Sequence, residues 1–139
     1  MRLYASPEYL ATHGEPAQIE DVRHHRLICQ NTKSAQVGAG LQLVQKLMTY
    51  DLPSMLTVNN YFGVLQAVIH NLGIGVLPDY VTQDFEGVKR VLPELESVEV
   101  PVYLAYPEEL RHSKRIDAFR DFVLSEIIEH RRKLRDATQ

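Results

Sequence analysis

The sequence contains 139 residues, which is the usual size of one domain and enough to bury a hydrophobic core. Hydrophobic residues make up 45% and charged residues 24%, a balance that is ordinary for a globular chain and argues against wholesale disorder. The 15 Lys and Arg are outnumbered by 18 Asp and Glu, and the net charge of -3 argues against a domain that binds nucleic acid by itself.

The cysteine content and the apolar runs favour a cytoplasmic location. The single cysteine, Cys29, cannot form an internal disulfide, and its apolar neighbours predict a buried side chain. The residues after Met1 lack the apolar core of a secretion signal, and there is no run of about 18 apolar residues. We therefore expect a protein of the reducing cytoplasm with no membrane partner.

Strand and helix signals alternate from the start of the chain. Residues 2–5 are predicted to form a strand, and Ser6 then offers an N-cap for a short helix over residues 7–12, with Pro7 at its first position. Gly14 can adopt the left-handed conformation that ends such a helix. A strand therefore leads directly into a helix.

The next segment is predicted to be mainly sheet. A second short helix over residues 18–25 precedes a strand over residues 26–30, whose apolar run is flanked by polar side chains. Residues 31–40 are predicted to be a loop, and residues 41–44 and 55–58 are predicted to be two further strands.

The clearest signal is an amphipathic helix that follows Asn59 and Asn60, which offer an N-cap. Its apolar positions, spaced by three and four, are Tyr61, Val64, Leu65, Val68 and Leu72. Gly73 is expected to close this helix, and a buried strand over residues 74–77 and a brief helix over residues 78–81 are expected to follow. The order strand, helix, strand, helix predicts an α/β fold.

The C-terminal part combines two predicted strands, over residues 88–92 and 99–106, with a long helix. Ser113 can cap this helix, which is expected to run to about Leu134 and to bury a stripe made of Ile116, Phe119, Val123 and Ile127. Residues 111–135 carry eight basic and four acidic side chains, a balance of +4. Basic residues are usual at a solvated helix end, and direct DNA binding near Arg131 is the alternative.

The residue patterns predict binding without catalysis. The six histidines, at positions 13, 24, 25, 70, 112 and 130, form no recognisable ligand pattern, so no metal and no cofactor are expected. Ser6 lies at a strand-to-helix junction, as the nucleophile of an esterase does, but Pro7 removes the backbone N–H that would serve as an oxyanion donor. We therefore interpret Ser6 as an N-cap, with a small esterase as the weaker alternative.

Two strand-to-helix junctions offer free backbone N–H groups to small anions. They are Ser6-Pro7-Glu8 and Asn59-Asn60-Tyr61. The second junction has no proline and no acid in its first turn, so it leaves more donors free.

Taken in order, these segments resemble the regulatory domain of LysR-type transcription regulators. The matching segments are residues 3–14, 20–28, 58–68, 73–80, 100–107 and 114–122, and the most specific of them is Val58-Asn59-Asn60-Tyr61-Phe62-Gly63-Val64-Leu65-Gln66-Ala67-Val68. The resemblance implies an α/β fold of the periplasmic-binding-protein-like type II class, a mixed sheet flanked by helices. It implies that residues 1–98 form the second regulatory subdomain. Residues 99–139 would supply a return strand and the C-terminal helix of the first subdomain, the rest of which is absent.

The resemblance also implies a function. Members of this family hold a small effector in a cleft between two subdomains, and binding shifts the arrangement of an oligomer on DNA. The expected ligand-binding residues here are Ser6, Asn59, Asn60, Tyr61 and Phe62. Backbone amides would hold an anionic group and the aromatic rings would cover an apolar body, which suits a small organic acid.

The remaining partners follow from what a complete member would carry. DNA would be bound only through an N-terminal helix-turn-helix, which is not in this sequence. A strand near residues 102–105 would lack neighbours, so we expect a homodimer in which this strand and the helix after Ser113 pair across a symmetry axis. A periplasmic-type solute-binding protein is the alternative function, and it would call for a secretion signal.

Overall fold

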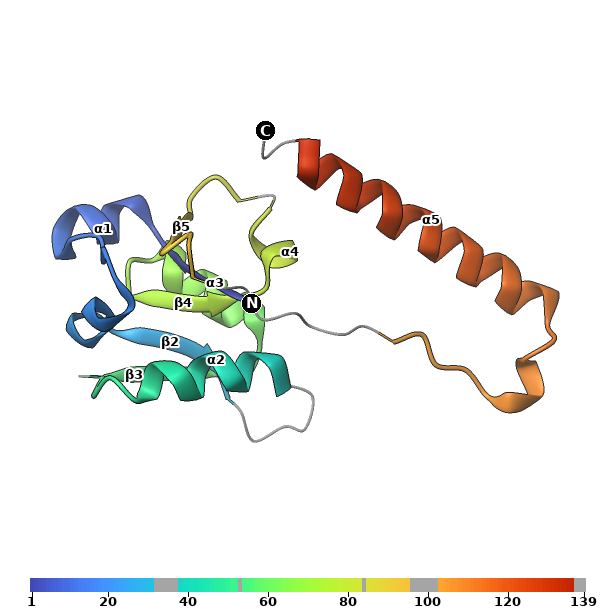
Figure 1. Ribbon diagram of the computed structural model, residues 1–139, viewed down its shortest axis with the longest axis horizontal. Coiled ribbons are helices and arrows are strands. Elements are labelled where there is room, and N and C mark those ends of the chain that lie inside the picture. The colour runs from blue at the N-terminus through green and yellow to red at the C-terminus, as the bar shows by residue number, and fades with distance from the viewer. Residues whose placement is uncertain (32–37, 53, 84, 96–102, 137–139) are drawn as a thin grey trace. The chain divides into compact units, whose positions relative to one another are not determined.

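The computed structural model describes residues 1–31, 38–52, 54–83, 85–95 and 103–136. The chain divides into two compact units, residues 1–100 and residues 101–139. The first unit contains the sheet and the second contains the long C-terminal helix (Figure 1).

A five-stranded mixed sheet forms the centre of the first unit. In chain order the strands are β1 (Arg2–Ala5), β2 (Leu27–Gln30), β3 (Met55–Val58), β4 (Ile74–Leu77) and β5 (Lys89–Val91). Their order across the sheet is β3-β2-β4-β1-β5. Strands β2, β3 and β4 run parallel, whereas β1 runs antiparallel to both of its neighbours, β4 and β5. The strands predicted over residues 2–5, 26–30, 55–58, 74–77 and 88–92 are thereby confirmed.

Helices cover both faces of the sheet, because successive side chains along a strand point to opposite faces. On one face lie α1 (Pro7–His13), the 3-10 helix η1 (Ile19–His24) and α2 (Gly38–Met48), whose buried residues pack with Leu3 and Leu27. On the other face lie α3 (Tyr61–Ile69) and α4 (Asp79–Thr82), whose buried residues pack with Tyr4 and Ile28.

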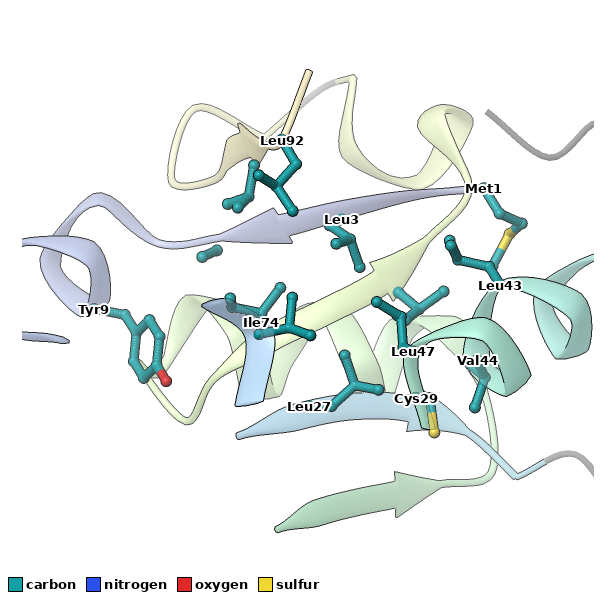
Figure 2. Packing of buried hydrophobic residues seen from close by; sticks show 14 of the residues in the cluster. Met1, Leu3, Tyr9, Leu27, Cys29, Leu43, Val44, Leu47, Ile74 and Leu92 are labelled. Carbon is teal, nitrogen blue, oxygen red and sulfur yellow. The ribbon is translucent and has the colours of Figure 1, made fainter. Parts of the chain in front are cut away.

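Helix α2 includes residues 41–44, which were predicted to be a strand, and residues 38–40, which were predicted to be part of a loop. Both predictions are wrong for these residues. Leu43, Val44 and Leu47 are buried, and Figure 2 shows them packed toward the sheet near Cys29. Spacings of one and four place these three side chains on one face of a helix. The alternation of Leu41 and Leu43 with Gln42 imitates a strand over four residues. Residues 32–37 of the predicted loop lie outside the described residues.

The connection from α3 to β4 also differs from the prediction. Helix α3 ends at Ile69 with His70 as its C-cap, and Leu72, expected on the buried stripe, is 41% exposed. Gly73 therefore does not close the helix. It lets β4 start close to β2, because a Cβ atom at Gly73 would lie 2.3 Å from the carbonyl oxygen of Arg26. Its backbone φ of 158° is one that glycine adopts most readily.

The second unit contains a short 3-10 helix, η2 (Glu108–Leu110), and α5 (Lys114–Asp136). The long helix is confirmed, but its predicted stripe is not buried within the second unit: Phe119 is 54% and Ile127 is 40% exposed, while Ile116 and Val123 are only partly covered. Tyr103–Tyr106 pair with no described strand, so the strand predicted over residues 99–106 is wrong there, and residues 99–102 lie outside the described part. Among the described helices, none is long and apolar enough to span a membrane.

Candidate functional site

Polar and aromatic side chains gather where the three parallel strands end. The register pairs Gln30 with Val58, and β4 runs in the same direction beside β2, ending at Leu77. We call this side of the sheet the carboxyl edge, and the side where β2, β3 and β4 begin the amino edge. In open α/β sheets, ligands bind outside the carboxyl ends of the parallel strands.

Two asparagines prepare the start of α3 at the carboxyl edge. The Asn60 side chain accepts a hydrogen bond from the backbone N–H of Gly63 at 2.8 Å, so Asn60 is the N-cap, as predicted. Asn60 Nδ2 donates to Asn59 Oδ1 at 2.8 Å, and Gln30 Nε2 donates to the backbone oxygen of Asn59 at 3.1 Å. These bonds hold the turn between β3 and α3 in one conformation.

The first turn of α3 keeps hydrogen-bonding capacity unused. In the part of the chain that the structure describes, the backbone N–H groups of Tyr61 and Phe62 donate to no protein acceptor, as is usual for the first turn of a helix. This turn contains no acidic residue. Gln30 Oε1 is buried and has no partner among the described atoms. Donors at a helix N-terminus favour negative charge.

Aromatic rings flank these donors. Phe62 is 68% exposed, Tyr80 at the start of α4 is 62% exposed, and Tyr61 is half-buried. Burial raises the pKa of the Tyr61 hydroxyl, and the Tyr80 phenol acts in the same direction. Tyr80 also belongs to this edge, which no sequence pattern indicates, because only the fold places α4 beside α3.

A charged group at the same edge was also missed. Arg2 Nε lies 2.9 Å from Asp79 Oδ2, and the Tyr4 hydroxyl donates to Asp79 Oδ1 at 3.0 Å. Arg2 pairs with Leu77 across the antiparallel strands, which brings the start of β1 to the end of β4. Arg2 and Asp79 form a short ion pair, but the Nε–H group of Arg2 does not point along a hydrogen bond to Asp79. The guanidinium therefore keeps this hydrogen-bond donor unused. Burial is the main cause that raises the pKa of Tyr4.

Ser6 is not at this edge. Because β1 is antiparallel to β4, with Tyr4 opposite Gly75, Ser6 follows β1 at the amino edge. The buried Ser6 Oγ accepts a hydrogen bond from the backbone N–H of Tyr9 at 3.1 Å and donates to Asn71 Oδ1 at 2.5 Å. Its N-cap role is confirmed. The expected single site is divided, since Asn59, Asn60, Tyr61 and Phe62 lie together and Ser6 lies at the opposite edge.

Among the described residues, the hydroxyl of Ser6 is not hydrogen-bonded to a general base. A serine nucleophile needs a general base that accepts its proton. The hydroxyl of Ser6 instead donates to an amide oxygen, and the amide nitrogen of Asn71 in turn donates to Glu8 Oε2 at 2.7 Å. These bonds join α1 to the turn before β4, which is a structural role.

The sequence of this chain matches the model of a known protein family. The family model described as the LysR substrate binding domain matches residues 1–127. This chain belongs to the LysR substrate-binding domain family. The resemblance inferred from the sequence is thereby confirmed.

Two relatives of this LysR-family chain are bacterial HTH-type transcriptional regulators. One, from Haemophilus influenzae, is 28% identical over 106 residues, which are 74% of this chain and 37% of the relative. The other, YhjC of Escherichia coli, is 27% identical over 120 residues, which are 83% of this chain and 40% of the relative. The chain thus spans about two-fifths of the length of these relatives.

Solved structures of LysR-type regulatory domains share the fold. The regulatory domain of CrgA from Neisseria meningitidis superimposes with a TM-score of 0.69 at 23% identity, over 90% of this chain and 63% of that domain. The regulatory domain of AphB from Vibrio vulnificus gives a TM-score of 0.64 at 20% identity, with the same coverage. The predicted fold class, a periplasmic-binding-protein-like mixed sheet flanked by helices, is confirmed.

Proposed function

We propose that this LysR-family chain is the effector-sensing part of a cytoplasmic transcription regulator, and that it binds a small organic anion at the carboxyl edge. The observation that carries the proposal is the first turn of α3, where the N–H groups of Tyr61 and Phe62 are free among the described residues beside the fixed Asn59–Asn60 pair. The exposed ring of Phe62 supplies apolar contact area. Ser6 is left out of this proposal because it lies at the amino edge.

The division of labour in the chain follows the family. Residues 1–98 act as the second regulatory subdomain, and residues 99–139 supply a segment of the first subdomain. The separation of the chain into units at Val100 and Pro101 supports this assignment. The effector acts by binding and not by reacting, and DNA is bound through a helix-turn-helix of the complete regulator.

A titration tests the ligand site. The 139-residue chain, labelled with nitrogen-15, is titrated with acetate, succinate and benzoate while amide NMR shifts are followed. The shifts should concentrate at Asn59–Phe62 and leave Ser6 unchanged. A response confined to other segments, or none with any of the three acids, would refute the proposed site.

A charge-reversal pair sharpens this test. Asn60→Asp keeps an oxygen that caps α3 but adds a negative charge where the anion should sit, and should weaken binding about tenfold. Gln66→Glu adds the same charge to an exposed position further along α3 and should leave affinity within about twofold. Equal weakening by both variants would indicate a general charge effect and not a site at the helix start.

We also place a homodimer contact on α5. In the described chain its apolar side chains remain exposed, with Phe119 at 54%, Phe122 at 61% and Ile128 at 67%. Exposed apolar groups of this extent mark interaction surfaces in soluble proteins. Light scattering should give a dimer mass at micromolar concentration, and Phe119→Ser should shift it to the monomer. A monomer across the whole concentration range would contradict this assignment.

A further inference from the structure

A buried histidine at the amino edge takes no part in the proposed effector site. His25 is 5% exposed and follows the last residue of η1, at the start of the segment that leads into β2. Its backbone N–H donates to the carbonyl oxygen of Val22 at 3.0 Å. A fully buried histidine must either remain neutral or find a partner for its charge.

The ring of His25 faces α1. The Tyr9 hydroxyl lies 3.3 Å from His25 Nδ1, and the Tyr9 ring stacks on His13 with centroids 4.3 Å apart and planes 17° from parallel. His13 Nδ1 lies 3.2 Å from the backbone oxygen of Tyr9. Tyr9 is therefore held between two imidazoles, and the contact of Tyr9 with His25 joins α1 to η1.

The hydrogen bonds at Tyr9 suit a neutral His25. Burial is the main cause that raises the pKa of the Tyr9 phenol, and the backbone of Arg26 acts in the opposite direction. The Tyr9 hydroxyl can donate to His25 Nδ1, which lies 3.3 Å away and accepts only in the neutral ring. A proton on Nδ1 turns this nitrogen into a donor, so the Tyr9 hydroxyl must turn its own hydrogen away and loses His25 as its acceptor.

The charged groups around His25 do not compensate for the positive charge that protonation of its ring would add. The groups that act electrostatically on the ring are His13 of α1 and His24 and Asp21 of η1, and Arg26 follows His25 in the chain. Burial is the main cause that lowers the pKa of His25, and positive charge on His13 and His24 lowers it further. Asp21 acts in the opposite direction, but its carboxylate already accepts from the backbone N–H groups of Ala17 and Gln18 at 3.0 and 3.1 Å.

We infer that His25 is an acid-sensitive latch: proton uptake by its ring separates α1 from η1 and loosens the amino edge of the sheet. The device is independent of the proposed effector site, which lies at the carboxyl edge. It would make the regulatory domain respond to acidification as well as to a small molecule.

The direction follows from linkage. The folded state holds His25 less protonated than the open state does, so opening takes up a proton. Above the ordinary histidine pKa of 6.5 both states are neutral and the latch is stable. As the pH falls below 6.5, opening becomes more favourable by up to about tenfold per pH unit, until the lowered folded pKa is reached.

Hydrogen exchange on the 139-residue chain tests this inference at pH 7.5, 6.5 and 5.5, with rates corrected for their intrinsic pH dependence. Protection of amides in residues 8–30 should fall several-fold between pH 6.5 and 5.5, while protection in α3 should stay constant. His25→Asn places a neutral amide near the position of Nδ1 and should remove this pH dependence. His24→Asn, at the exposed neighbour, should keep it. An unchanged slope in His25→Asn, or a flat wild-type profile, would overturn the inference.

A second measurement covers the case in which His25→Asn does not fold at pH 7.5, as judged by circular dichroism. The ring protons of His25 in the wild-type chain are then titrated by NMR. A midpoint below 6.5 supports the latch, and a midpoint at or above 6.5 overturns it.

Discussion

The hydroxyl of Ser6 donates a hydrogen bond to the side-chain oxygen of Asn71, although the two residues are 65 positions apart in the chain. Asn71 has a positive φ of 63°, and its amide nitrogen donates to Glu8. One serine thus caps α1 and also fixes the left-handed turn that precedes β4. This bond contributes to the stability of the amino edge and lies away from the proposed effector site at the carboxyl edge.

Ser6→Ala should therefore destabilise the fold without changing the affinity for small anions. The loss of the N-cap costs about 1 kcal/mol and the unpaired Asn71 oxygen adds a similar amount, so the free energy of unfolding in urea should fall by roughly 2 kcal/mol. Ser125→Ala, on the exposed surface of α5, should change it by less than about 0.5 kcal/mol. A Ser6→Ala chain of normal stability that had lost binding would reinstate Ser6 as a ligand residue.

Gly73→Ala should be among the most damaging single substitutions in the first unit. An added Cβ would meet the Arg26 carbonyl oxygen at 2.3 Å, and backbone must move to relieve that clash. We expect a loss of about 3 kcal/mol or more in the free energy of unfolding. Gly87→Ala provides the control, since a Cβ there has open space within 4 Å. Equal effects of the two substitutions would show that steric contact is not the reason.

Leu47→Ala tests the helical assignment of residues 38–48. Leu47 is a fully buried residue of α2, so its truncation should lower the free energy of unfolding by about 2–5 kcal/mol. Met48→Ala removes a side chain that is 54% exposed and should cost less than about 1 kcal/mol. Thermal unfolding of the two variants measures the difference, and a larger loss at Met48 would mean that the helix faces the other way.

Cys29 should be inert in the folded chain. Its side chain is 2% exposed, and burial raises the pKa of the thiol, so the reactive thiolate is scarce at pH 8. Labelling by a colorimetric thiol reagent should be slower than in urea by a factor on the order of a hundred or more, because it requires opening of the structure. Rapid labelling of the native chain at pH 8 would show that the face of β2 under α2 is accessible.

Local signals predicted most of the first unit. The caps Ser6 and Asn60 each act on a backbone group three residues away, so their helices could be located from neighbouring residues alone. The helix over residues 38–48 was missed because a four-residue alternation of leucines fits a strand as well as a helix. Longer windows that include Val44 and Leu47 favour the helix.

The composition of the candidate site was harder to predict, because it depends on the direction of β1. Ser6 and Asn60 both follow a strand and precede a helix, and the sequence around each is compatible with a ligand-binding turn. Only the pairing of Arg2 with Leu77 shows that β1 runs against β4 and takes Ser6 to the amino edge. The same pairing brings Arg2 to Asp79, a contact that no local pattern indicates.

The position of β1 within the sheet bears on how the chain folds. Leu3 pairs with Val76 and with Val91, so both partners of the first strand are made more than 70 residues after it. During synthesis β1 leaves the ribosome before β4 and β5, so its apolar side chains stay uncovered until those two strands have followed. Contacts of such long sequence separation slow folding, because a large loop must close before they form. The parallel unit from β2 to β4 can therefore assemble first, and insertion of β1 beside it becomes the closing step.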